Sequence, residues 1–93
     1  MIIDFKSKEI GKIFSGEFSK MFPQDIYRVI QRKLWMIDAS VNLQDLRIPP
    51  SNRLEKLKGK RVGQYSIRIN KQWRICFRWQ NGNAYQIEVV DYH

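Results

Sequence analysis

The spacing of apolar side chains changes near Gly63, and this change constrains the fold more than any other feature of the sequence. Ahead of that point, two stretches carry apolar residues at helical spacing, as in amphipathic helices. Beyond it, apolar and polar residues alternate, as expected for strands with one buried face. The pattern predicts helices over residues 7–16 and 24–39, and residues 1–5, which are apolar and rich in isoleucine, predict a short strand.

Three further strands are expected after Gly63, over residues 64–69, 73–79 and 85–90. Asn81-Gly82 lies between the last two. This dipeptide favours a tight hairpin turn, because both of its residues adopt positive φ more readily than most. In the last strand, Tyr85, Ile87 and Val89 would share one face of the sheet.

Residues 40–63 predict a long loop, because they hold Pro49-Pro50, two glycines and many polar side chains. Loops of this length are uncommon in compact domains unless they have a function. The order of elements predicts one α+β domain over residues 1–93. In that domain, an N-terminal strand and two helices would pack on a mainly antiparallel four-stranded sheet, in the order β-α-α-β-β-β.

Positive charge is concentrated in one part of the chain. The net charge is +8, but residues 47–78 contain ten lysines or arginines and a single acid, Glu55, so this stretch carries +9 and the remainder −1. Such a one-sided block repels itself when the chain folds, and a polyanion would relieve the repulsion. The distribution therefore favours nucleic acid as the partner, over an acidic protein or a membrane surface.

Strand alternation places three of these charges on one face. If the aromatic side chains of the sheet face the helices, Arg68, Arg74 and Arg78 emerge together on the opposite face. Adjacent strands lie about 4.8 Å apart, so these guanidinium groups could converge on one phosphate. Like charges side by side in a sheet are destabilising, which favours a functional interpretation. The alternative is that each arginine lies along the sheet or pairs with Glu88.

Several other classes of protein do not fit the sequence. The first residues lack the basic start of a signal peptide and include Asp4. The longest apolar run, Leu34–Ile37, is far shorter than the roughly 20 residues of a membrane span. A single cysteine, Cys76, fits a reducing compartment, so we expect a soluble, cytoplasmic protein without membrane contact. One histidine and one cysteine cannot make a zinc site, and no metal or other cofactor is expected.

Several motifs make the chain similar to a known family. They are Pro49-Pro50-Ser51-Asn52, Arg53-Leu54-Glu55-Lys56-Leu57-Lys58-Gly59, Tyr65-Ser66-Ile67-Arg68-Ile69-Asn70, Trp73-Arg74-Ile75-Cys76-Phe77-Arg78-Trp79 and the final Asp91-Tyr92-His93. Together they resemble the HigB toxins of the RelE superfamily, in the subgroup with a Pro-Pro-x-Asn loop. The resemblance covers essentially the whole chain, and its Trp-Arg-x-x-Phe strand and terminal Asp-Tyr-His are specific in combination.

This resemblance implies a RelE-like fold and the toxin of a type II toxin–antitoxin system. Such toxins enter the A site of the 30S ribosomal subunit, contact rRNA and cleave the mRNA codon there. The RNA 2′-hydroxyl is the nucleophile, and no metal is used. The implied inhibitor is a HigA-like helix-turn-helix antitoxin, through which the complex would bind operator DNA. The expected activity is thus that of a ribosome-dependent endoribonuclease, or mRNA interferase.

Metal-free cleavage needs a base for the 2′-hydroxyl, positive charge on the phosphoryl oxygens and an acid for the 5′-oxygen. His93 is the only histidine, and the ordinary pKa of histidine, about 6.5, suits proton transfer near neutrality. We assign His93 as the general acid, or as the base under the alternative scheme. Asp91 would orient or charge-balance the site, and Tyr92 would stack on a base or donate a hydrogen bond.

Arg74 is the first candidate for stabilising the pentavalent phosphate, because a planar guanidinium matches its oxygens. Lys58 is the second, carried over from a matching lysine in the family. Some HigB relatives carry a histidine where this chain has Glu55. Glu55 could act as the base, as a carboxylate does in other toxins of the superfamily, or it could be a solvated partner of Lys58 or Arg53.

Other basic residues are expected to hold RNA phosphates: Arg53, Lys56, Lys60, Arg61, Arg68 and Arg78. The alternative function is a non-catalytic module that uses the same basic face to bind rRNA or an acidic antitoxin. Glu55 keeps this alternative open, because it replaces the histidine of the relatives. A DNA-binding repressor in its own right is disfavoured, because no helix-turn-helix is evident.

Overall fold

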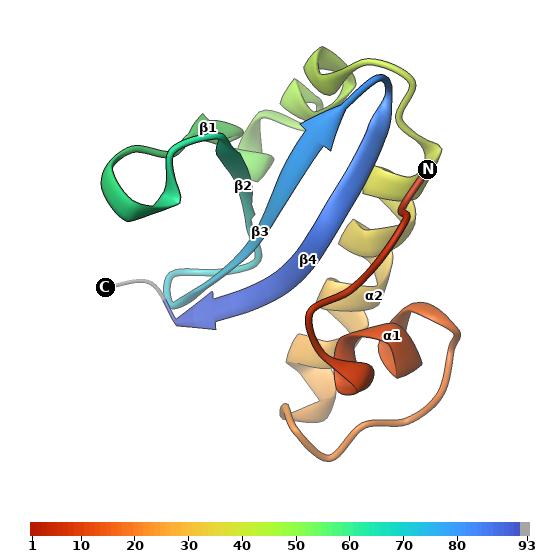
Figure 1. The fold of residues 1–93 in the computed structure, drawn as a ribbon. Coiled ribbons are helices and arrows are strands. Elements are labelled where there is room, and N and C mark those ends of the chain that lie inside the picture. Colours follow the sequence, from red (N-terminus) through yellow and green to blue (C-terminus); the bar gives the residue numbers. More distant parts are fainter. Residues whose placement is uncertain (92–93) are drawn as a thin grey trace.

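The computed structural model describes residues 1–91, in which two helices cover one face of a sheet (Figure 1). The helices are α1 (Lys8–Phe14) and α2 (Gln24–Ala39). The sheet contains β1 (Glu55–Lys56), β2 (Gln64–Arg68), β3 (Trp73–Gln80) and β4 (Asn83–Asp91), in that spatial order and antiparallel throughout. The predicted α+β class is confirmed.

Local sequence signals place the ends of these elements. α2 spans the predicted residues, and α1 begins after Ser7, whose hydroxyl accepts a hydrogen bond from the backbone N–H of Glu9 (3.1 Å). α1 ends at Phe14, slightly earlier than expected. The β3–β4 hairpin turns at Asn81-Gly82, where φ is +53° and +78°. A tight turn requires these positive values, which explains why that dipeptide predicted it.

The core lies between the helices and the sheet. Its fully buried side chains on α2 recur at helical spacing, and those of the sheet alternate along β2 and β3: Ile30, Leu34, Ile37, Ile67, Ile75 and Phe77. A charged residue, Lys33, lies within the buried stripe of α2 and is only 5% exposed. The apolar pattern did not predict this buried charge.

Residues 1–5 lie alongside β4 and run parallel to it (Figure 1). They form two isolated bridges rather than a continuous strand, one from Ile2 to Ala84 and one from Phe5 to Ile87. Four backbone hydrogen bonds of 2.8 to 3.2 Å flank the bridges. The prediction of a regular N-terminal strand is therefore wrong in detail, and the fourth strand of the sheet is β1, within the predicted loop.

A bulge in β4 changes which side chains face the helices. Gln86 has a φ of +53°, and the register between β3 and β4 shifts at this point. An extra residue reverses the alternation beyond it. Ala84 and Ile87 are consequently both buried, whereas Tyr85 pairs with Arg78 on the outer face. The prediction that Tyr85 and Ile87 share a face is wrong for this reason.

The predicted loop over residues 40–63 is more ordered than expected. It contains three short 3-10 helices, η1 (Leu43–Arg47), η2 (Pro50–Asn52) and η3 (Gly59–Arg61), as well as β1. Leu46 and Leu57 are buried and fix the segment to the body of the protein. The segment carrying β1 and η3 forms one side of the molecule, away from α1 (Figure 1).

Candidate active site

Arg74 lies on the outer face of the sheet, but it is buried, with 6% of its surface exposed. Its Nε donates a hydrogen bond to the hydroxyl of Ser66 (2.8 Å), and Nη2 donates one to the carbonyl oxygen of Arg53 (2.6 Å). The prediction that Arg68, Arg74 and Arg78 all emerge is therefore wrong for Arg74. The chain just ahead of β1 holds this guanidinium in place, which the strand pattern alone could not indicate.

A carboxylate lies beside this guanidinium. Glu55 Oε2 is 3.5 Å from Nη2 of Arg74, and the glutamate side chain is 47% exposed, against 8% for the arginine. The sequence left open an ionic partnership of Glu55 with Lys58 or Arg53, and the structure gives Arg74 as its partner. In chemical terms, a carboxylate can accept a proton and a guanidinium can pair with a phosphate, so the two groups suit acid–base chemistry at a phosphate ester.

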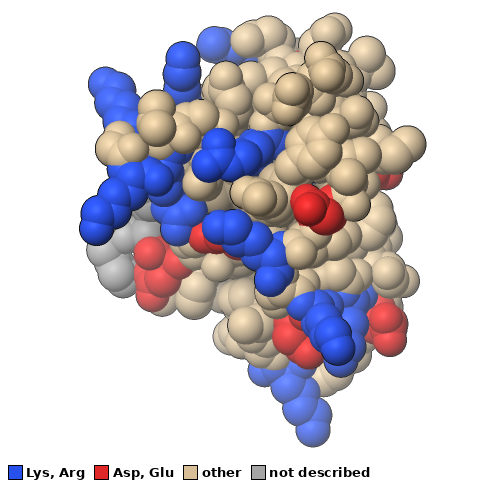
Figure 2. All heavy atoms as spheres, in the orientation of Figure 1, with Lys and Arg blue, Asp and Glu red and all other residues tan. Residues whose placement is uncertain are grey.

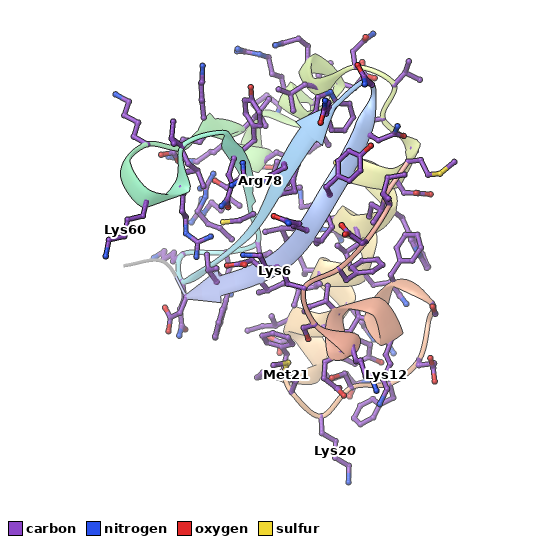
Figure 3. The ribbon with its side chains drawn as sticks, in the orientation of Figure 1. Lys6, Lys12, Lys20, Met21, Lys60 and Arg78 are labelled. Carbon is purple, nitrogen blue, oxygen red and sulfur yellow. The ribbon has the colours of Figure 1, made fainter. Side chains whose placement is uncertain are left out.

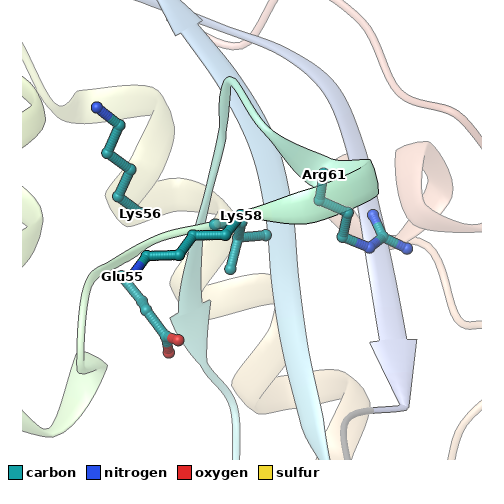
Figure 4. A pocket seen from close by; sticks show the side chains of 5 residues that line it. Glu55, Lys56, Lys58 and Arg61 are labelled. Carbon is teal, nitrogen blue, oxygen red and sulfur yellow. The ribbon is translucent and has the colours of Figure 1, made fainter.

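Glu55 also faces a hollow of about 390 Å³ (Figure 4). It is lined by Glu55, Lys56, Leu57, Lys58 and Arg61. Lys56 points away from Glu55, because neighbouring residues of a strand face opposite sides (Figure 4). The three cationic side chains confirm that the β1–η3 segment concentrates positive charge, and they make the hollow suited to an anionic ligand.

The basic residues of this hollow belong to a larger surface. Figure 2 shows lysine and arginine side chains gathered on the side formed by β1 and η3. Lys60 extends from the tip of the η3 loop, and Arg78 lies in front of β3 (Figure 3). Arg78 is exposed and donates a hydrogen bond from Nε to Gln86 (3.2 Å). Arg68 is the register partner of Arg74 and donates to the carbonyl oxygen of Asn70 (3.1 Å).

Glu88 ties the η3 segment to the sheet. Its carboxylate accepts hydrogen bonds from Arg61 (2.8 Å) and Lys6 (2.7 Å), so Arg61 lies across the outer face. Burial alone would raise the pKa of Glu88, but the hydrogen bonds and charges of Lys6 and Arg61 outweigh burial and lower the pKa below 4.5. Glu88 thus pairs with an arginine of the loop, rather than with the strand arginines considered from the sequence.

Replacing Glu88 with glutamine should lower the free energy of unfolding at pH 7 by about 1 kcal/mol. Because folding lowers the pKa of this carboxylate, its contribution is present at neutral pH and is lost as the pH falls below 4.5. Urea unfolding of the parent and the Glu88→Gln variant over this range would measure the effect. A stability difference that stays constant into strong acid would contradict it.

Cys76 lies on the outer face between Arg74 and Arg78 in sequence, and is 1% exposed. Burial raises the pKa of its thiol, and this effect outweighs the nearby arginine charges, which act in the opposite direction. The positive charges around Cys76 therefore do not yield a thiolate. Cys76 fills space beneath the charged residues.

The end of β4 lies next to the strand that carries Arg74. Val90 is the register partner of Arg74, and Asp91 is that of Trp73. The carboxylate of Asp91 accepts a hydrogen bond from the side chain of Gln72 (3.1 Å). Two predicted catalytic residues, Tyr92 and His93, lie outside the described residues. Within residues 1–91, no cluster of histidine, cysteine, aspartate or glutamate could hold a metal ion.

Sequence reasoning missed three buried polar residues, Ser66, Lys33 and Asn52. Ser66 supports the guanidinium of Arg74 from β2, and Lys33 donates a hydrogen bond to Asn52, the residue before Arg53. Two signals were present in the sequence. Asn52 is the asparagine of the Pro-Pro-x-Asn motif, and Lys33 occupies an apolar position of the α2 stripe, between Ile30 and Ile37.

Comparison with known proteins resolves the family. The model described as "RelE-like toxin of type II toxin-antitoxin system HigB" matches residues 3–93. The chain belongs to this HigB family. Two HigB relatives are Toxin HigB-1 of Vibrio cholerae, 40% identical over 85 residues and 90% of each chain, and Endoribonuclease HigB of Proteus vulgaris, 37% identical over 94 residues and the whole of both.

HigB membership makes this protein the toxin of a type II toxin–antitoxin system, with an antitoxin as its partner. Its fold is also found in the Staphylococcus aureus YoeB toxin, solved in a heterotetrameric complex with YefM. That match has a TM-score of 0.62 and 22% identity, and it covers 100% of this chain and 95% of the other. The RelE-like architecture expected from the sequence is therefore confirmed. No helix within residues 1–91 is long and apolar enough to span a membrane.

Proposed function

We propose that this HigB-family toxin is an endoribonuclease that cleaves mRNA in the A site of the ribosome. The observation that carries the proposal is the ion pair of Arg74 with Glu55, a residue that also lines a basic hollow. The pair joins a phosphate-binding cation to a potential base, and a HigB relative is named as an endoribonuclease. The excess of lysine and arginine over residues 47–78 suits a polyanionic substrate.

In this mechanism Glu55 accepts the proton of the RNA 2′-hydroxyl, and the oxygen attacks the adjacent phosphorus. A 2′,3′-cyclic phosphate forms as the bond from phosphorus to the 5′-oxygen breaks. Arg74 and Lys58 stabilise the negative charge of the pentavalent phosphate. His93 gives a proton to the 5′-oxygen, with Asp91 orienting or charge-balancing it and Tyr92 stacking on a base. No metal or other cofactor takes part.

The burial of Arg74 restricts how RNA approaches. Since the carbonyl oxygen of Arg53 and the hydroxyl of Ser66 hold the guanidinium, the scissile phosphate approaches from the side of Glu55. Further contacts to mRNA and rRNA phosphates come from Arg53, Lys56, Lys60, Arg61, Arg68 and Arg78. Arg61 has to exchange or share its contact with Glu88 when RNA binds.

Membership of the HigB family supports an antitoxin as the partner. We propose that the antitoxin is a HigA-like helix-turn-helix protein, and that operator DNA is bound through the toxin–antitoxin complex. We also propose that the protein acts in the cytoplasm, where mRNA is translated, without membrane contact.

Primer extension on a reporter mRNA in a reconstituted bacterial translation system would test the activity. Cuts that require both the protein and ribosomes, at the A-site codon, are expected. Cuts in the absence of ribosomes would support the nuclease activity but contradict its dependence on ribosomes. Ribosome stalling without cuts would instead support the alternative function, a non-catalytic module that binds RNA or the ribosome. The presence of Glu55, where the sequence resemblance implies a histidine in some relatives, keeps this alternative open.

A further inference from the structure

Lys33 is a buried ammonium group in the apolar stripe of α2. It is 5% exposed, and its Nζ donates a hydrogen bond to Oδ1 of Asn52, which is fully buried. Burial, helped by the charge of the neighbouring Arg32, lowers the pKa of Lys33. Burying such a group usually costs stability, and an apolar side chain at the same place is often equal or better for the fold. Its presence therefore calls for a role other than stability.

Asn52 connects this ammonium group to the loop ahead of β1. Its Nδ2 donates hydrogen bonds to the carbonyl oxygens of Leu46 (3.1 Å) and Ile48 (3.4 Å). One side chain thus fixes the end of η1, the residue ahead of Pro49 and the end of η2. Lys33 holds the acceptor side of the same amide, which sets the orientation of Asn52.

The residue after Asn52 contacts the proposed catalytic arginine directly. Arg53 has a φ of +46°, in the left-handed region that a non-glycine residue rarely adopts. Its carbonyl oxygen accepts the 2.6 Å hydrogen bond from Nη2 of Arg74. Two residues further on, Glu55 makes its 3.5 Å contact with the same nitrogen. The placement of Asn52 therefore determines two contacts of Arg74 at once.

We propose that Lys33 and Asn52 are positioning residues, which act through the Arg53 carbonyl to hold the Arg74 guanidinium for phosphate binding. This inference rests on the proposed function of Arg74. Neither residue touches RNA. The pair makes the position of Arg74 depend on α2, and thereby on the rigid core. Small errors in the position of a reacting group are costly, since a misplacement of roughly 1 Å can lower a rate by about 10²-fold.

The test is the Lys33→Met variant, which keeps the apolar stem and removes the ammonium group. We expect its single-turnover cleavage rate to fall by about 10-fold to 10²-fold, while the half-saturating concentration of programmed ribosomes and the melting temperature are maintained. The Nη2–H resonance of Arg74, which reports the contact with the Arg53 carbonyl and is assigned with an Arg74→Lys variant, should shift or broaden. Lys33→Gln, which keeps a donor for Asn52, should restore part of the rate.

Ile30→Ala is the matched control, because Ile30 is buried on α2 one turn before Lys33. It should lower the melting temperature and leave the Arg74 resonance in place. A Lys33→Met protein with the parent's rate and an unshifted resonance would overturn the proposal. The proposal would also be overturned if both variants lost cleavage rate in proportion to their loss of melting temperature while the Arg74 resonance stayed unshifted.

Two further outcomes separate this inference from the proposed activity. If the parent cuts no RNA, the proposed function fails, and the Arg74 resonance still decides whether Lys33 positions the guanidinium. If Lys33→Met does not fold, hydrogen exchange of the Arg74 Nη2–H is compared between the parent and Lys33→Gln. We expect this N–H to be protected in the parent and to exchange faster in the variant, and equal exchange would overturn the inference.

Discussion

Replacing Arg74 with lysine is expected to lower the rate of mRNA cleavage by about 10²-fold to 10³-fold. Lysine keeps the positive charge, but it cannot donate to Ser66 and to the Arg53 carbonyl in the fixed geometry of a guanidinium. The remaining charge would lie at a different point relative to the phosphate. Single-turnover cleavage of mRNA on programmed ribosomes, followed by primer extension, measures this loss.

Arg68→Lys is the matched control for that experiment. Arg68 lies on β2, directly opposite Arg74, and receives the same substitution. Within residues 1–91, Glu55 pairs with Arg74, and no contact between Arg68 and Glu55 is seen. Arg68 is expected to hold RNA without touching the reacting atoms. Losing its guanidinium should therefore weaken RNA binding and leave the cleavage rate at saturation close to that of the parent. Equal rate losses in the two variants would remove the special role of Arg74.

Glu55→Gln should lower the cleavage rate by about 10²-fold to 10⁴-fold, the range typical for the loss of an acid–base group. Glutamine has nearly the same shape and cannot accept the proton of the 2′-hydroxyl. The same change removes the single acid from a stretch of net charge +9. Binding to ribosomes should therefore tighten while the rate falls. Affinity measured by sedimentation and rates measured by primer extension would show both effects.

A substitution that removes an equal charge elsewhere separates the two effects of Glu55→Gln, the loss of a proton acceptor and the loss of a negative charge. Glu17 is exposed in the loop after α1, and Glu17→Gln should leave the cleavage rate unchanged. Glu55→His should keep activity, because an imidazole can accept the proton of the 2′-hydroxyl in place of the carboxylate. If Glu55→Gln cleaves like the parent, the base is not Glu55, and the scheme with His93 as base gains support.

Much of the fold could be predicted because it depends on local signals. The stripe of α2 repeats an apolar residue on one face over four turns, and a periodic signal of that length is hard to mistake. Asn81-Gly82 specified the hairpin, since few other dipeptides adopt the required φ values. The charge of residues 47–78 could be assigned to one side of the molecule, since most of it lies in one continuous stretch of chain, and the candidate site is proposed on that side.

The features that could not be predicted depend on contacts between distant segments. The bulge at Gln86 reverses the alternation in β4, and no residue type in this part of the sequence indicates a bulge. Arg74 is at a position that alternation exposes, yet the chain at Arg53 covers it. Lys33 lies within the apolar stripe of α2, but the sequence does not show that its hydrogen-bond partner is Asn52, 19 positions away. Such features require the tertiary structure.

The pairing of residues 1–5 with β4 joins two segments that lie far apart in the sequence. Ile2 contacts Ala84 and Phe5 contacts Ile87, whereas the β3–β4 hairpin forms between neighbouring segments of the chain. Contacts between residues so distant in sequence close late in folding. We therefore expect the hairpin to form before residues 1–5 reach β4. Until they do, the outer edge of β4 exposes unpaired backbone groups that could pair with another chain.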